Sequence, residues 1–134
     1  MREPIVLASR TGGALELTPA GPVDHGGVRH WMVHVRGEGL DARVHCSDAD
    51  WLPEDLTSFF ARLAEKSDRF GEEVWDSEEL RLVISHPKAN TMLVQATLAL
   101  HAPPLWTVET QIEMDPGAFG QAAELIRHAS DVSF

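Results

Sequence analysis

The sequence is poor in several features that mark particular classes of protein. Its 134 residues include one cysteine, Cys46, which excludes a disulfide framework within the chain and a cysteine-based metal knot. No apolar run is long enough for a signal peptide or for the roughly 18 residues of a membrane helix. Eleven lysines and arginines face 21 aspartates and glutamates, without the basic stripe typical of nucleic-acid binding. We therefore expect a cytoplasmic protein that binds neither membranes nor nucleic acid.

Catalytic sequence motifs are also missing. No serine stands in a Gly-x-Ser-x-Gly pattern, and there is no Gly-x-x-x-x-Gly-Lys phosphate loop. Cys46 falls on the apolar face of an expected strand, which favours an inert packed thiol over a reactive one. The sequence accordingly predicts no catalytic residue and no resident cofactor, and an enzyme is the less favoured interpretation.

Negative charge is what the sequence has in excess, and most of it lies in one segment. Between Asp48 and Glu79, eleven acidic residues face three basic ones, which gives −8 of the chain's formal net charge of −10. A local negative field attracts basic surfaces and repels nucleic acid and anionic membranes. Trp51 and Trp75 flank this segment, and aromatic side chains are common anchors at protein interfaces. The competing interpretation is a solvated acidic loop with both tryptophans packed at a sheet edge.

Periodic patterns of apolar residues predict both strands and helices. We expect strands around residues 5–7, 15–17, 30–36, 40–46, 80–84, 92–100 and 106–114, and helices near 53–66 and from 116 onward. The second helix is expected to have Asp115 as its N-cap and Pro116 at its first position. Hairpin-linked strands favour one antiparallel sheet of about six or seven strands. One helix follows the fourth strand, the other lies at the C-terminus, and both are expected to pack on the apolar face of the sheet. The predicted fold is a single two-layer α+β domain over residues 1–134, with an acidic linker between its two groups of strands.

The hairpin over residues 30–46 has a register that parity determines. Apolar residues are odd-numbered on its first strand and even-numbered on its second, so a two-residue turn at Glu38-Gly39 brings them to one face. This register sets Arg36 opposite Asp41. It also gathers three histidines on the other face, namely His30, His34 and His45. Three histidines on a sheet can bind zinc and leave a position open for water. A metal-binding or small hydrolytic protein is therefore one alternative, and a histidine-rich outer face without metal is the plainer one.

Aromatic and apolar positions between residues 56 and 129 follow a recognisable order through a helix, a meander of strands and a closing helix. The positions that carry this order are Phe59, Phe60, Gly71, Glu72, Trp75, Leu80, Leu82 and Trp106. In this order the chain resembles the small bacterial proteins of domain of unknown function family 6228. More distantly it is similar to immunity proteins of the WapI type, which neutralise toxins delivered between bacteria. The resemblance implies an α+β fold and a protein-binding role, and it supplies no catalytic residues.

The function that these patterns favour is binding of a basic protein partner, such as a toxin, by an acidic surface. The residues predicted to make this contact are Trp51, Glu72, Glu73, Trp75, Asp76, Glu78 and Glu79. A third alternative is a dimerising structural module, because Val83 and Leu93 are apolar positions on an otherwise polar strand face. A homo-oligomer is therefore also one of the alternatives that the sequence allows.

Overall fold

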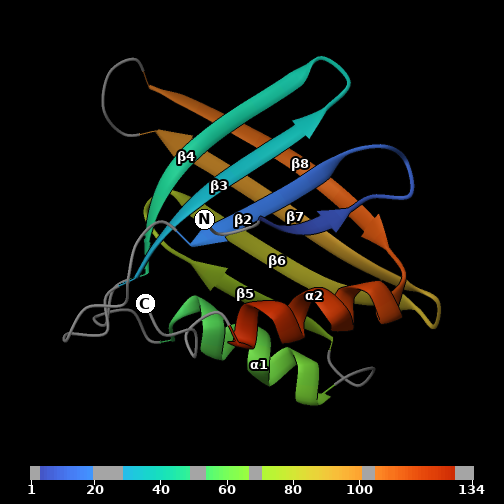
Figure 1. Cartoon of the computed structure of the whole chain (residues 1–134). Helices are drawn as coiled ribbons and strands as arrows, with labels where there is room; N and C mark the ends of the chain where they lie inside the picture. The colour runs from blue at the N-terminus through green and yellow to red at the C-terminus, as the bar shows by residue number, and fades with distance from the viewer. Residues whose placement is uncertain (1–3, 20–28, 49–53, 67–70, 101–104, 129–134) are drawn as a thin grey trace.

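The computed structural model describes residues 4–19, 29–48, 54–66, 71–100 and 105–128. Eight strands and two helices lie in these ranges (Figure 1). In chain order they are β1 (Ile5–Ala8), β2 (Ala14–Pro19), β3 (Arg29–Gly37), β4 (Leu40–Asp48), α1 (Leu56–Lys66), β5 (Glu72–Asp76), β6 (Leu80–Lys88), β7 (Thr91–Leu100), β8 (Trp106–Met114) and α2 (Pro116–His128).

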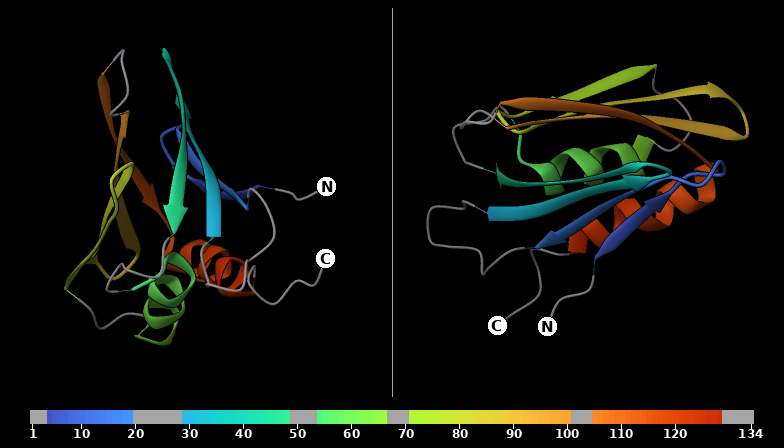
Figure 2. Two further views of the ribbon diagram at one scale, coloured as in Figure 1. Left: turned by 90° about the vertical axis from the view of Figure 1, so that its left-hand side faces the viewer. Right: turned by 90° about the horizontal axis from the view of Figure 1, so that it is seen from above.

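The strands form two antiparallel sheets, not the single sheet that was predicted. One sheet has the order β1-β2-β3-β4 and the other has the order β5-β6-β7-β8. The mixed α+β class and the two helices are confirmed, whereas one sheet of six or seven strands is wrong. The two sheets face each other, and both helices lie side by side across one end of the pair (Figure 2). An alternating pattern tells which side chains face inward, but it does not tell which strands pair. The chain starts a new sheet after α1.

Apolar side chains from both sheets and both helices form one core. Most inward residues of the strands are buried at the positions that alternation predicted, and Trp31 is fully buried among them. The inward positions that are only half-buried are Leu40, Leu100, Trp106 and Val108. Four large side chains of α1 close the helical end: Leu56, Phe59, Phe60 and Leu63. The ring of Phe60 lies 6.0 Å from that of Phe119 on α2. The helices therefore cap the core at one end of the paired sheets and do not form a second layer over one sheet.

The register of the β3–β4 hairpin is confirmed residue by residue. Trp31 pairs with Cys46, Met32 with His45, and Gly37 with Leu40 across the turn. Gly39 has a φ of 72°, a conformation that a side chain disfavours. The Glu38-Gly39 turn thus sets which face of each strand enters the core.

Each helix begins after an aspartate cap. Asp55 accepts hydrogen bonds from the Ser58 amide at 3.2 Å and the Thr57 hydroxyl at 2.9 Å. Burial alone would raise the pKa of Asp55, but these bonds outweigh it and hold the pKa below its ordinary value. The predicted cap of the second helix is confirmed, since Asp115 accepts from the Gly117 amide at 3.2 Å.

The predicted acidic linker is in part a strand. Residues 72–76 form β5, which pairs antiparallel with β6, so the predicted three-stranded meander has four strands. A register shift between Ser85 and Lys88 marks a β-bulge where β6 turns into β7. Ala89 and Asn90 form a two-residue turn, which by itself would pair even-numbered residues of one strand with odd-numbered residues of the other. The extra residue in the bulge shifts the register by one, so that even-numbered residues of both strands face the core.

Polar contacts join the two sheets near the turn between β1 and β2. The backbone amide of Arg10 donates to the carbonyl oxygen of Glu113 at 2.9 Å. Its guanidinium donates to the Thr91 hydroxyl at 3.3 Å and to the carbonyl oxygen of Asn90. Neither α1 nor α2 has the length and apolar character needed to cross a membrane.

Candidate functional site

Acidic side chains gather on β5 and on the turn that leads from β5 to β6. Glu72, Asp76 and Glu78 are exposed, and Glu79 is half-buried. These four residues were predicted to contact a basic partner, and the structure brings them to one edge of the second sheet. Trp51, the remaining aromatic of the prediction, lies outside the described residues.

The side chains of β5 alternate between the two faces of its sheet. Glu72, Val74 and Asp76 point outward, and Val74 is 44% exposed. Glu73 and Trp75 point toward the helical end of the core. Exposed acids on alternate positions of an edge strand oppose indiscriminate pairing with other chains. They also present a row of negative charge to a partner.

Trp75 is a core residue, and its predicted role as an exposed anchor is wrong. Its side chain is 3% exposed. The indole Nε1 donates a hydrogen bond to the carbonyl oxygen of Glu54 at 2.8 Å. A buried indole usually satisfies its one donor in this way. Acidic neighbours in the sequence do not expose Trp75, because alternation along β5 turns its side chain to the opposite face.

Glu73 belongs to an ion-pair network with α1. The Arg62 guanidinium donates two bonds to the Glu54 carboxylate, at 2.8 and 2.9 Å, and a third to Glu73 Oε1 at 2.8 Å. The same guanidinium lies 5.4 Å from the centre of the Phe59 ring. Hydrogen bonding to Glu54, together with the charge of both carboxylates, raises the pKa of Arg62 further above its ordinary value. Glu73 therefore joins β5 to α1 rather than adding to the exposed acidic row.

Two of the three predicted histidines lie together on the outer face of the first sheet. The rings of His30 and His45 stack with their centres 4.9 Å apart and their planes at 16°. Nδ1 of His30 is buried and has no hydrogen-bond partner among the residues that the structure describes. Parallel stacked rings do not direct their nitrogen lone pairs to one point, so this arrangement is unlike a zinc site.

His34 turns away from that pair toward two carboxylates. Its Nε2 lies 2.7 Å from Asp41 Oδ1, and its Nδ1 lies 3.7 Å from Glu16 Oε1. Arg36 stands opposite Asp41 in the register, as predicted, and its side chain forms an ion pair with Glu16 on β2. Within the described ranges, no three histidine, cysteine, aspartate or glutamate side chains are placed to hold a metal ion.

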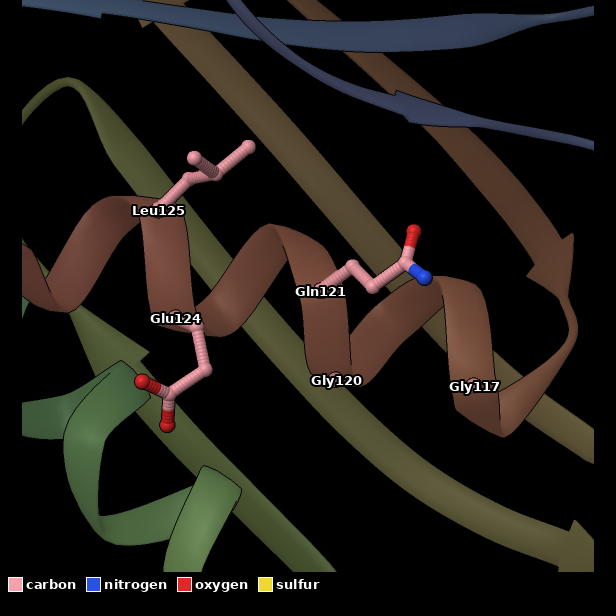
Figure 3. Close-up of a pocket in the computed structure, with 5 residues that line it drawn as sticks. All are labelled: Gly117, Gly120, Gln121, Glu124 and Leu125. Atoms are coloured by element: carbon pink, nitrogen blue, oxygen red, sulfur yellow. The ribbon is translucent and has the colours of Figure 1, made fainter.

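A shallow pocket lies along the exposed side of α2 (Figure 3). It has a volume of about 620 Å³ and a mostly apolar lining. Two glycines, Gly117 and Gly120, line it together with Leu125, which is 60% exposed. Among the described residues that line it, Glu124 supplies the one carboxylate and none is a nucleophile. These described residues do not form the set of groups that acid–base or nucleophilic catalysis requires.

Sequence reasoning missed two residues that shape the acidic edge. Val74 was not singled out, although a β-branched residue next to a tryptophan is a strand signal. Arg62 was counted only as a cation opposing the acids. Its position three residues after Phe59 places it on the same side of the helix, which is a usable signal for its contact with that ring.

Comparisons with known proteins show a family for this chain and assign no activity. No curated protein matches the sequence. Residues 7–131 match the Family of unknown function (DUF6228), which is nearly the whole chain and extends well before the segment in which the resemblance was found. The chain is therefore a member of the Family of unknown function (DUF6228).

Proposed function

We propose that this protein is a small cytoplasmic binding protein whose acidic edge recognises a basic protein partner. The observation that carries the proposal is a set of exposed acids on one edge strand and on the turn that follows it. Glu72 and Asp76 belong to β5, and Glu78 belongs to the turn. Oppositely charged surfaces accelerate association and favour one class of partner over others. The proposed contact residues do not include Trp75, which is buried in the core, or Glu73, which is paired with Arg62.

The local charge balance supports this role. Arg62, one of three cations in the acidic segment, is held by Glu54 and Glu73. The positive charge of Arg62 offsets the charge of those two carboxylates. It therefore does little to reduce the negative potential around the outward acids of β5. A toxin that acts on an anionic substrate such as nucleic acid has a basic surface, and an acidic protein can cover that surface. Immunity of the WapI type is the specific form of the proposal.

Co-purification with the products of neighbouring genes tests the proposal. We expect a basic protein to bind at about 50 mM salt and to be released at several times that concentration, because screening weakens contacts between exposed charges. Failure of every neighbouring gene product and of basic proteins in general to bind at low salt would contradict the proposal.

Self-association through α2 is a second candidate function. Leu125 is a large exposed apolar side chain, and it stands eight residues from Gly117 on the same pocket. In an antiparallel pair of α2 helices centred on Gln121, Leu125 of each copy would fill the space above Gly117 of the other. Such a contact is symmetric, as dimer interfaces generally are. Sedimentation at two protein concentrations tests it, and a monomer at both would contradict it.

A further inference from the structure

Strand β5 ends its sheet, and its second edge is not paired with a strand in the described part of the chain. The sheet order is β5-β6-β7-β8, and β6 alone runs alongside β5 among the described elements. An edge strand presents a row of backbone amides and carbonyls that another extended chain can pair with. This open edge coincides with the acidic row.

The hydrogen-bond pattern tells which backbone groups of β5 face that open edge. The Ser77 amide donates to the carbonyl oxygen of Leu80 at 2.9 Å, in the same register that pairs Asp76 with Arg81. Hydrogen-bonded and non-hydrogen-bonded pairs alternate along an antiparallel ladder. The pairs of Trp75 and Glu73 with β6 are therefore hydrogen-bonded ones. The backbone groups of Glu72, Val74 and Asp76 then point to the open edge.

The same three residues carry the outward side chains of β5. A strand added at the edge would thus bond the backbone of Glu72, Val74 and Asp76 while its own outward side chains lie beside theirs. Val74 is 44% exposed and lies next to Val83 across the sheet, so it offers an apolar contact between two carboxylates. The edge therefore offers backbone groups that can pair with another strand. Beside them lie two acidic side chains, Glu72 and Asp76, with the apolar side chain of Val74 between them.

That pattern selects against a second copy of this chain. If two β5 strands paired antiparallel about Val74, Glu72 of each would stand opposite Asp76 of the other. Like charges directly opposite each other destabilise a strand pair. A segment with basic residues at the two outer positions and an apolar residue between them has the complementary pattern. The charges of β5 therefore favour pairing with a basic strand of a partner over pairing with β5 of a second copy.

We infer that β5 binds an extended basic segment of the partner by strand addition, with the partner's main chain pairing to Glu72, Val74 and Asp76. The inference rests on the proposed function and adds its binding mode, which recurs in peptide recognition. Main-chain bonds supply affinity in this mode, and alternate side chains supply specificity.

A cyclic hairpin peptide whose free strand reads Lys-Thr-Val-Thr-Lys is a suitable probe, since cyclisation reduces the ordering cost of binding. We expect the amide hydrogens of Glu72, Val74 and Asp76 to exchange more slowly when the peptide is bound. The amides of Glu73 and Trp75 already bond to β6 and should change little. A peptide with glutamate in place of both lysines should not bind. Uniform protection across the protein, or none at these three amides, would overturn the inference.

Val74→Pro removes one outward amide at the centre of the edge and leaves the bonds to β6 in place, which an edge strand tolerates. Val74→Ala is the matched control, because it shortens the side chain and keeps the amide. We expect Val74→Pro to weaken peptide binding by about tenfold, the effect of one lost hydrogen bond and a disturbed strand, and Val74→Ala by less than about threefold. Equal affinities of the two variants would overturn strand addition.

A change on the peptide covers the case in which Val74→Pro does not fold. Methylating the peptide amides that face β5 should abolish binding to the unaltered protein. Methylating the outward amides of the hairpin's second strand, which bond neither β5 nor the binding strand, should not. The results also separate the two proposals. If a basic protein binds through Glu72 and Asp76 while Val74→Pro and peptide methylation have no effect, strand addition is wrong and the acidic contact stands. If neutralising those two acids has no effect, the proposed function itself is wrong.

Discussion

The indole Nε1 of Trp75 donates a 2.8 Å hydrogen bond to the backbone carbonyl oxygen of Glu54. This bond connects the edge strand β5 with the residues that lead into α1. Arg62 reinforces the same connection by bonding Glu54 and Glu73 together. The acidic edge is therefore connected to α1 by one buried aromatic side chain and one ion-pair network, and its outward acids, Glu72 and Asp76, are exposed.

Replacing Trp75 tests its assignment to the core. We expect Trp75→Phe to lower the free energy of unfolding by about 1–3 kcal/mol, because it removes a buried hydrogen bond and part of a packed side chain. Denaturant unfolding measures this effect. The affinity for a basic partner should stay unchanged while the protein is folded. A large loss of affinity with normal stability would instead support the anchor role that the structure contradicts.

Arg62 should contribute to stability through its fork geometry. We expect Arg62→Met to destabilise the fold by about 1–2 kcal/mol, since it removes three charge-assisted bonds that are partly shielded from water. Arg62→Lys, the control, keeps the charge but cannot form the bidentate contact with Glu54 and should recover only part of the loss. The difference between Arg62→Met and the unaltered protein should narrow at high salt. A difference that grows with salt would contradict this electrostatic account.

Asp55 should make stability depend on pH in the acidic range. Its pKa in the folded protein is lowered, so its contribution is fully present above its ordinary value of 3.8 and is lost as the pH falls through the lower folded value. We expect Asp55→Ala to cost about 1 kcal/mol at neutral pH, as for other helix caps. Unfolding measured at pH 7 and near pH 2 checks this, and the cost should shrink at the lower pH. An equal cost at both would contradict a role for the ionised carboxylate.

Cys46 should be inert in the folded protein. It is fully buried, and its Sγ lies 3.3 Å from the Ser77 hydroxyl. A thiol reagent should label it only as fast as the protein opens, and at once in denaturant. Rapid labelling of the native protein would show that the interior between the two sheets is accessible.

The parts of the fold that follow from local pattern could be predicted from the sequence. Parity of apolar residues and the Glu38-Gly39 turn determined the β3–β4 register, which the structure confirms. The cap at Asp115 followed from its side chain and from the proline after it. Each of these depends on residues close together in the chain, where turn geometry and strand alternation leave few options.

Features that depend on distant contacts could not be predicted in this way. Nothing in the alternation of β4 or β6 tells that the chain changes sheets between them. The sequence of β5 indicates a loop rather than a strand because its three acids outnumber its two apolar residues. The histidines reached the predicted face, but His34 turned to Asp41 and Glu16, and that choice depends on which side chains of β2 lie nearby. The basic partner stays a prediction.

Two pairs of acids on one sheet offer the most direct test of the acidic contact. Glu72→Gln with Asp76→Asn neutralises the outward acids of β5, and Glu109→Gln with Glu113→Gln neutralises two exposed acids on β8 at the other edge. Both double variants change the net charge equally. The measurement is the dissociation constant, at about 50 mM salt, of the basic protein that co-purifies with the chain. We predict that the β5 variant binds about tenfold or more weakly, since two exposed ion pairs contribute up to about 1 kcal/mol each, and that the β8 variant stays close to the unaltered protein. Equal affinities of the two variants, or no basic partner at all, would contradict the account.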